Sequence, residues 1–210
     1  MSLAVLVVLV GPLLLFNPWF TSALQQRHDV AAAFGTSQRE VDRVTGEILV
    51  DLYVDGPFDA AIEPGRPLLD AEERSHMHDV SVLVRVLAGI ALLAAVLAVV
   101  SGAMLRGERR RMGRIMLVAG AIVGSVAILL AGTFAVAFDA AFLAFHELLF
   151  PPGTYLFAEG SNLITLFPEG FWFDAALAAG AAIIISAIVV SLVGLRRWRG
   201  EPGVDAAGLI

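Results

Sequence analysis

The chain has 210 residues, of which 58% are hydrophobic, and its mean hydropathy is +0.81. Several apolar runs approach the roughly 20 residues that a helix needs to cross a bilayer, which indicates an integral membrane protein and excludes a water-soluble one. The net charge is −6, and the absence of cysteine excludes disulfides, thiolate metal sites and a cysteine nucleophile. No alternating strand pattern is present, so we expect an all-α membrane protein.

The apolar runs predict four transmembrane helices, at about residues 3–22, 80–104, 115–138 and 175–195. Eight of the fourteen arginines lie in two clusters, and lysine is absent. Because arginine accumulates in cytoplasmic loops, both termini are predicted to be cytoplasmic. The connecting segments are then extracytoplasmic at 23–79 and 139–174 and cytoplasmic at 105–114 and 196–210. A cleaved signal peptide ending near Ala23 is an alternative for the first run, although the positively charged start is missing.

The extracytoplasmic segment 23–79 contains twelve of the twenty Asp and Glu residues. Ser37 followed by Glu40 fits a capping box, and a helix is predicted from about 38 to 54 because apolar residues follow at helical spacing. These apolar residues are Val41, Val44, Ile48 and Leu52. The stripe is expected to pack on the bundle, with contact to a substrate's lipid chains as the alternative. His28 lies before this helix and is expected to be solvated.

A second acidic cap, Asp70, begins a helical pattern that continues unbroken to Met104. Its ~34 residues would extend about 50 Å, so the first turns must stand above a hydrocarbon core of roughly 30 Å. These turns contain His76 and Asp79, which share a helix face, so Asp79 is expected to accept a hydrogen bond from His76 and fix its tautomer. The alternative is a polar helix start without a catalytic role. Arg85, further down the helix, is expected to reach the interface, with pairing to Glu169, Asp174 or a lipid phosphate as the alternative.

Residues 142–173 contain nine of the eighteen aromatic residues. Pro151, Pro152, Gly153 and Gly160 interrupt this stretch, which therefore favours an interfacial or re-entrant segment over a spanning helix. His146 follows the third helix and so lies on the same outer side as His76. The two imidazoles are expected to meet there.

Two histidines, one acting as base and one as acid or orienting group, suffice for acyl transfer from an ester to an amine without metal or cofactor. A divalent metal held by the histidines and nearby carboxylates is an alternative, but no known ligand spacing is present. A transporter is disfavoured because the helices contain almost no intramembrane charge besides Arg85.

Two motifs resemble those of a known family. The run Glu73–Val80 (ERSHMHDV) resembles a His-Met-any-Asp-Val motif at the entry to a membrane helix. A second run, Phe145–Phe150 (FHELLF), continues through Ser161–Ile164 (SNLI) to Leu166–Phe171 (LFPEGF) and resembles a second signature. The family is a group of small four-helix bacterial integral membrane proteins that includes the lipoprotein intramolecular transacylases.

The resemblance implies a reaction in which the sn-2 acyl chain of a lipoprotein's diacylglyceryl group moves to the α-amine of its N-terminal cysteine. It implies catalytic roles for His76, His146 and Asp79, at an active site facing outside the cell membrane. Candidate substrate-binding residues are Arg74, Glu147, Tyr155 and Asn162. The expected partners are membrane lipids and a lipoprotein substrate, with no nucleic acid. The chain departs from the family at Asn162, where an acidic residue is expected, and over 151–159, so a non-enzymatic lipid-binding or partner-binding protein of the same family is the alternative.

Overall fold

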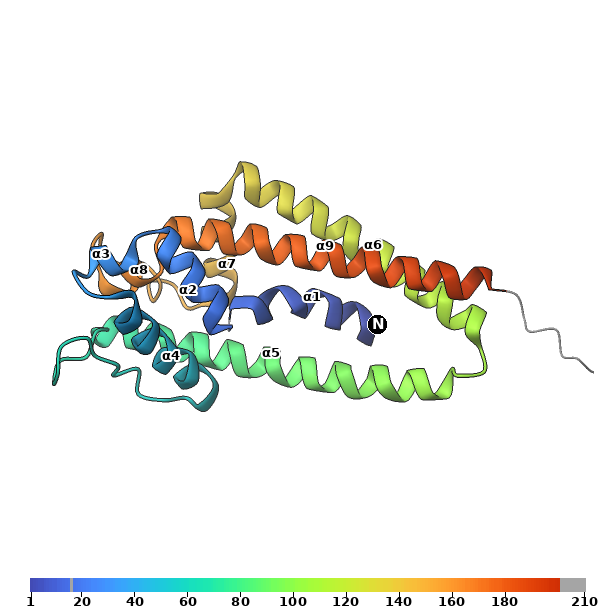
Figure 1. Cartoon of the computed structure of the whole chain (residues 1–210), viewed down its shortest axis with the longest axis horizontal. Helices are drawn as coiled ribbons and strands as arrows, with labels where there is room; N and C mark the ends of the chain where they lie inside the picture. Colours follow the sequence, from blue (N-terminus) through green and yellow to red (C-terminus); the bar gives the residue numbers. More distant parts are fainter. Residues whose placement is uncertain (16, 201–210) are drawn as a thin grey trace, which may run out of the picture.

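A computed structural model describes residues 1–15 and 17–200, and all regular structure within them is helical. The helices, in chain order, are α1 (Ser2–Leu15), α2 (Pro18–Arg27), α3 (Val30–Ala33), α4 (Gln38–Val54), α5 (Ala71–Met104), α6 (Arg109–Val136), α7 (Phe138–Leu149), α8 (Asn162–Leu166) and α9 (Glu169–Arg199). Figure 1 shows α5, α6 and α9 along the length of the molecule with α1 between α5 and α9. The short helices α2, α3, α4, α7 and α8 gather at one end, which we call the histidine end because His76 and His146 lie there.

Among the described residues, three helices are long and apolar enough to cross a membrane: α5, α6 and α9. Their outward-facing side chains are large and apolar, for example Leu92, Leu129 and Ile185, which are 69%, 70% and 61% exposed. Exposed apolar surface over the whole length of long helices is stable in lipid and not in water. The chain is therefore a membrane protein.

The single first helix expected over 3–22 is two helices in the structure. α1 has 14 residues and ends at Leu15, and a new helix begins at Pro18. The side chain of Asn17 accepts a hydrogen bond from the Trp19 backbone N–H at 3.0 Å. Because Pro18 disfavours helical geometry at the preceding residue and itself suits a first helical position, this Asn-Pro pair ends one helix and starts another. A fourth spanning helix stays a prediction.

The other long helices are longer than the sequence indicated. α6 begins at Arg109, so most of the arginine cluster expected to form a turn is helical, and the helix ends at Val136 with a break at Ala137. α9 begins at Glu169 and ends at Arg199. Arginine is a good helix former, and the first-turn Glu169 complements the helix dipole. Of the cytoplasmic tail predicted at 196–210, residues 201–210 lie outside the described part.

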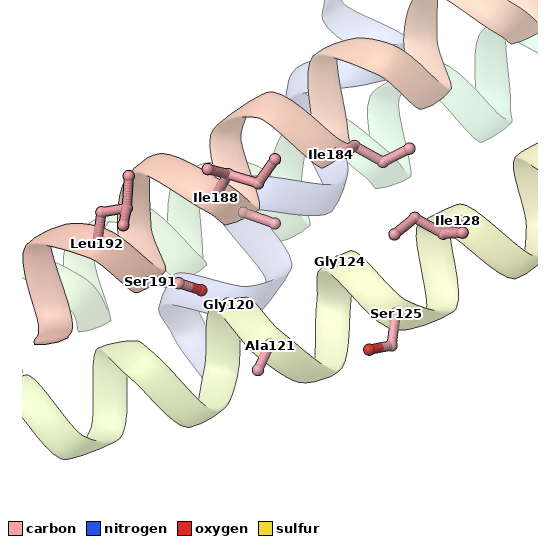
Figure 2. Close-up of a pocket in the computed structure, with 10 residues that line it drawn as sticks. Gly120, Ala121, Gly124, Ser125, Ile128, Ile184, Ile188, Ser191 and Leu192 are labelled. Carbon is pink, nitrogen blue, oxygen red and sulfur yellow. The ribbon is translucent and has the colours of Figure 1, made fainter.

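Glycine permits α6 and α9 to pack closely, because small residues at a helix interface let the backbones approach. A side chain at Gly120 would come within 2.7 Å of the Ala187 carbonyl oxygen, and one at Gly194 within 2.5 Å of the Leu117 backbone nitrogen. Figure 2 shows Gly120 and Gly124 of α6 along the groove that α9 borders with Ile188 and Ser191. The two helices are therefore in close backbone contact along this groove.

The histidine end has a hydrophobic core of its own. α4 buries Val41, Val44, Ile48 and Leu52, which confirms the predicted helix and its apolar stripe packing inward. The Ser37 hydroxyl accepts from the Glu40 backbone N–H, as predicted for the cap. The rest of the capping box is not formed, because the Glu40 side chain binds Arg43 instead.

Candidate active site

His76 lies in the second turn of α5, where the predicted acidic cap Asp70 forms part of a full capping box with Glu73. Asp70 accepts from the Glu73 backbone N–H at 2.8 Å, and the Glu73 carboxylate accepts from the Asp70 backbone N–H at 2.8 Å. The 34-residue helix is about 50 Å long, so these polar first turns project beyond a hydrocarbon core of about 30 Å. His76 is 6% exposed and packs on two aromatic rings, Phe150 at 4.9 Å and Phe157 at 5.5 Å between centroids.

His146 lies in the last turn of α7, which ends where Phe150 precedes Pro151 and takes an extended conformation. The Nδ1 atom of His146 is 2.7 Å from the carbonyl oxygen of Phe142, one turn earlier. A carbonyl oxygen only accepts hydrogen bonds, so Nδ1 carries the proton and the lone pair lies on Nε2. This fixed tautomer leaves His146 with a basic nitrogen that points away from its own helix.

The two histidine rings lie 6.1 Å apart between centroids, with 28° between their planes. The sequence analysis expected the rings to meet, and the structure brings them together. Phe150 is 7% exposed and contacts both rings, at 4.9 Å from His76 and 5.6 Å from His146. Tyr155 lies 5.4 Å from the His146 ring on the segment that follows α7. An aromatic cage therefore encloses the pair.

The expected hydrogen bond from His76 to Asp79 is not formed: Nδ1 of His76 is buried and has no hydrogen-bond partner among the described residues. The i, i+3 spacing does place Asp79 near His76, but packing against Phe150 and Phe157 decides the direction of the ring. Burial, and then the charge of a protonated His146, lower the pKa of His76 from 6.5 to about 4, while the Asp79 carboxylate acts in the opposite direction. His76 is therefore neutral at pH 7, and Asp79 acts on it only through its charge.

Glu73 supports the site in a way that the sequence did not reveal. Its side chain is buried, with 1% exposed, and its Oε1 atom accepts a hydrogen bond from the Leu163 backbone N–H at 2.8 Å. The Asn162 amide nitrogen donates to the Leu68 carbonyl oxygen at 2.6 Å. Both bonds join the start of α8 to the start of α5. They also fix the end of the 150–161 loop, which precedes α8. The position of Glu73 at the start of the first motif run was the only signal that the sequence offered.

A second buried polar group fixes the other end of α8. Gln25 is fully buried, and its amide nitrogen donates to the Leu166 carbonyl oxygen at 3.2 Å and to the Thr45 hydroxyl at 3.0 Å. Since Gln25 is on α2 and Thr45 on α4, one side chain joins three elements. Both ends of α8 are therefore held by buried side chains. The 150–161 loop, which leads into α8, has a fixed C-terminal end.

The remaining candidate residues lie around this cage rather than in it. Arg74 and Asn162 are half-buried, and Glu147 is exposed next to His146. Phe150 and Phe157, which contact His76 directly, were not singled out from the sequence. Within the described part of the chain, no three histidine, aspartate or glutamate side chains gather as metal ligands do.

Two other side chains have partners that the sequence did not indicate. His28 is not solvated, because its Nε2–H donates to an Asp174 carboxylate oxygen at 2.9 Å and the glycine at 170 leaves room for its ring. Arg85 pairs with Asp55 at the end of α4, at 3.0 Å, instead of with an acidic residue of the last helix. Asp55 also accepts from Nδ1 of His78 at 3.2 Å, so His78 points away from His76.

The sequence model of the family described as lipoprotein intramolecular transacylase Lit matches residues 1–172. The chain belongs to this family. No match is found among individually curated proteins. The fold is similar to that of the membrane-integral lipoprotein intramolecular transacylase Lit from Bacillus cereus, with a TM-score of 0.79 and 21% identity over 93% of this chain and 90% of that one. A form of the same Bacillus cereus protein with a histidine-to-arginine mutation gives a TM-score of 0.72 at 20% identity, over 93% and 87% of the two chains. At this identity the structural likeness establishes a Lit-like fold.

Proposed function

We propose that this member of the Lit family is an intramolecular transacylase, which moves the sn-2 acyl chain of a lipoprotein's diacylglyceryl group to the α-amine of its N-terminal cysteine. The observation that carries the proposal is the pair of imidazoles 6.1 Å apart, one with a fixed tautomer and one buried and neutral. Family membership supports a lipoprotein as the substrate class. The exchange of an ester for an amide is energetically favourable, so the reaction needs no ATP to drive it.

His146 is the proposed base. Its Nδ1–H is engaged by the Phe142 carbonyl, so Nε2 is the atom that takes a proton from the attacking amine. An α-amine has a pKa of about 7.7 to 8.0, so part of it is already neutral at pH 7 and the base has to remove only the proton released on attack. The carbonyl partner also stabilises the imidazolium that forms.

His76 is the proposed partner group. Because it is neutral and enclosed by Phe150 and Phe157, an N–H of its ring can donate to the oxyanion in surroundings of low dielectric constant, where such a bond is strong. Asp79 is proposed as a positioning residue. Its negative charge would stabilise positive charge that develops on the His76 ring in the transition state.

The proposed step balances without a co-reactant. The amine nitrogen forms a bond to the ester carbonyl carbon, and its proton passes to Nε2 of His146. The tetrahedral oxyanion then collapses, the bond from carbon to the sn-2 oxygen breaks, and that oxygen receives the proton from His146. The products are an amide at the cysteine and a free sn-2 hydroxyl, which together make the lyso-form.

Four residues are proposed to hold the substrate. Tyr155, 5.4 Å from His146, is the proposed contact for the reacting ester. The exposed carboxylate of Glu147 suits the amine before it loses its proton, and Arg74 suits a polar group of the peptide. Asn162 is proposed to accept a hydrogen bond from the substrate with its side-chain carbonyl oxygen, because its amide nitrogen already donates to the Leu68 carbonyl oxygen.

We also propose that the histidine end faces outside the cell membrane and that both termini are cytoplasmic, with α1 as the fourth membrane helix. The eight clustered arginines at the opposite end of α6 and α9 support this orientation.

The test is expression in a bacterial host that lacks N-acylated lipoproteins, with mass spectrometry of the N-terminal lipopeptide of a reporter lipoprotein. We expect the unchanged protein to convert the diacylglyceryl form to the N-acylated lyso-form and His146→Gln to lower the yield at least about a hundredfold, the size of a general-base contribution. His78→Ala is the matched control, because His78 is exposed and binds Asp55 outside the cage. If the unchanged protein yields no N-acylated lyso-form, the chain is instead a non-enzymatic lipid-binding or partner-binding member of the family. If His146→Gln yields as much lyso-form as the unchanged protein, His146 is not the base.

A further inference from the structure

The end of the molecule opposite the histidines is strongly basic. We call it the arginine end, and it comprises the start of α6, the loop before it and the end of α9. Figure 1 shows these two helix ends together at the side of the molecule away from α3 and α8. Its arginines are all exposed: Arg106, Arg109, Arg110, Arg111, Arg114, Arg196, Arg197 and Arg199.

Close backbone contact holds the two arginine clusters together. A side chain at Gly113 would lie 2.5 Å from the Trp198 backbone nitrogen and 2.6 Å from the Gly194 carbonyl oxygen. The Arg197 guanidinium also lies 2.7 Å from the Met112 sulfur of α6. The clusters are therefore one continuous surface on a rigid pair of helices, although about 80 residues separate them in the sequence.

Among the residues that the structure describes, almost none of this charge is compensated. Glu108 is the single acidic residue within 105–114 and 195–200, and it pairs with Arg111 at 2.9 Å. The other seven arginines have no carboxylate partner among the described residues. A like-charge cluster of this density repels itself unless anions bind it.

We propose that the arginine end binds the headgroups of anionic glycerophospholipids, those whose phosphodiester has no compensating amine, such as phosphatidylglycerol. Arginine binds phosphate with a bidentate fork, and basic surfaces between membrane helices recognise anionic headgroups in this way. Apolar side chains directly above the cluster, such as Ile115 and Leu192, are exposed to the acyl chains, so headgroup and tails are both accommodated. Trp198 is 46% exposed among the α9 arginines, which is the depth at which tryptophan meets the interface. The proposal does not depend on the transacylase activity.

Trp198 provides the readout. The chain has three tryptophans, so Trp19→Phe and Trp172→Phe leave Trp198 as the single one. This protein is reconstituted into nanodiscs of phosphatidylcholine that contain increasing fractions of brominated phosphatidylglycerol or brominated phosphatidylcholine, and quenching of Trp198 is measured. We expect half-maximal quenching at a mole fraction of brominated phosphatidylglycerol at least about tenfold lower than for brominated phosphatidylcholine, and the preference should decrease with added salt.

Arg110→Gln with Arg199→Gln should abolish most of this preference, at about fivefold for each arginine removed. The matched control removes the same charge at the other end, with Arg39→Gln and Arg66→Gln, both exposed and without an ion pair among the described residues. Quenching by brominated phosphatidylcholine should be the same in all three proteins, which verifies that each is folded into the bilayer. Equal quenching by both lipids in the unchanged protein overturns the proposal, and so does an equal loss of preference in the control pair.

Discussion

Replacing Glu73 with glutamine tests whether this buried carboxylate fixes α8 to the start of α5. Both carboxylate oxygens accept a backbone N–H, from Asp70 and from Leu163, each at 2.8 Å. Glutamine has the same shape but one acceptor, so its NH2 group would face an N–H and leave that donor unpaired. The remaining bond would also change from charge-assisted to neutral. Losing a charge-assisted bond of about 1.5–3 kcal/mol and burying an unpaired donor gives a cost of about 3 kcal/mol.

For a chain of this size each kcal/mol lowers the thermal midpoint by about 2–4 °C, so the variant should unfold about 6–12 °C earlier. The assay is thermal unfolding of the purified protein in detergent, followed by tryptophan fluorescence. Glu72→Gln is the matched control, because Glu72 is exposed on the same helical turn. An unchanged midpoint in Glu73→Gln, or an equal decrease in Glu72→Gln, would refute the assignment of Glu73 as the buried link.

Two further predictions concern packing and protonation. Gly113→Ala places a methyl group 2.5 Å from backbone atoms of α9, which cannot move aside like a side chain, so the free energy of unfolding should decrease by about 1–3 kcal/mol. Gly132→Ala is the control, since nothing lies within 4 Å there, and a similar decrease in both would contradict close packing as the cause. His76 has a pKa of about 4 in the folded protein and 6.5 when unfolded, so the unfolded state binds more protons between these values. The contribution of His76 to stability should therefore be constant above pH 6.5 and decrease by up to about 3 kcal/mol as the pH falls to 4. Denaturation midpoints from pH 7.5 to 4 check this, and a His76→Gln variant that shows the same decrease would exclude His76 as the source.

The local features of the fold could be predicted from the sequence because their causes are local. The caps at Ser37 and Asp70 and the apolar stripe of α4 depend on residues three or four positions apart. The meeting of His76 and His146 was also predictable, because the order of apolar runs and arginine clusters places both histidines at the same end.

Features that depend on distant contacts were not predictable in this way. The direction of the His76 ring is decided by Phe150 and Phe157, which belong to a loop more than seventy residues later. The partner of His28 is 146 positions away, so the charged residues next to His28 in the sequence gave no sign of its partial burial. The break near Asn17 was not predicted because the residues on both sides of it are apolar, and its cause is a cap formed by one side chain, that of Asn17.

The two anchors of α8 have a consequence for biosynthesis. The hydrogen-bond partner of Glu73 in α8 lies 90 positions later in the chain, and the partner of Gln25 lies 141 positions later. A nascent chain that has not yet emerged past Leu166 therefore holds a carboxylate and an amide with unmet hydrogen-bonding capacity. Folding of the histidine end must therefore follow synthesis and insertion of the preceding helices, so a chain that stalls on the ribosome before Leu166 would lie in the bilayer with this end unfinished.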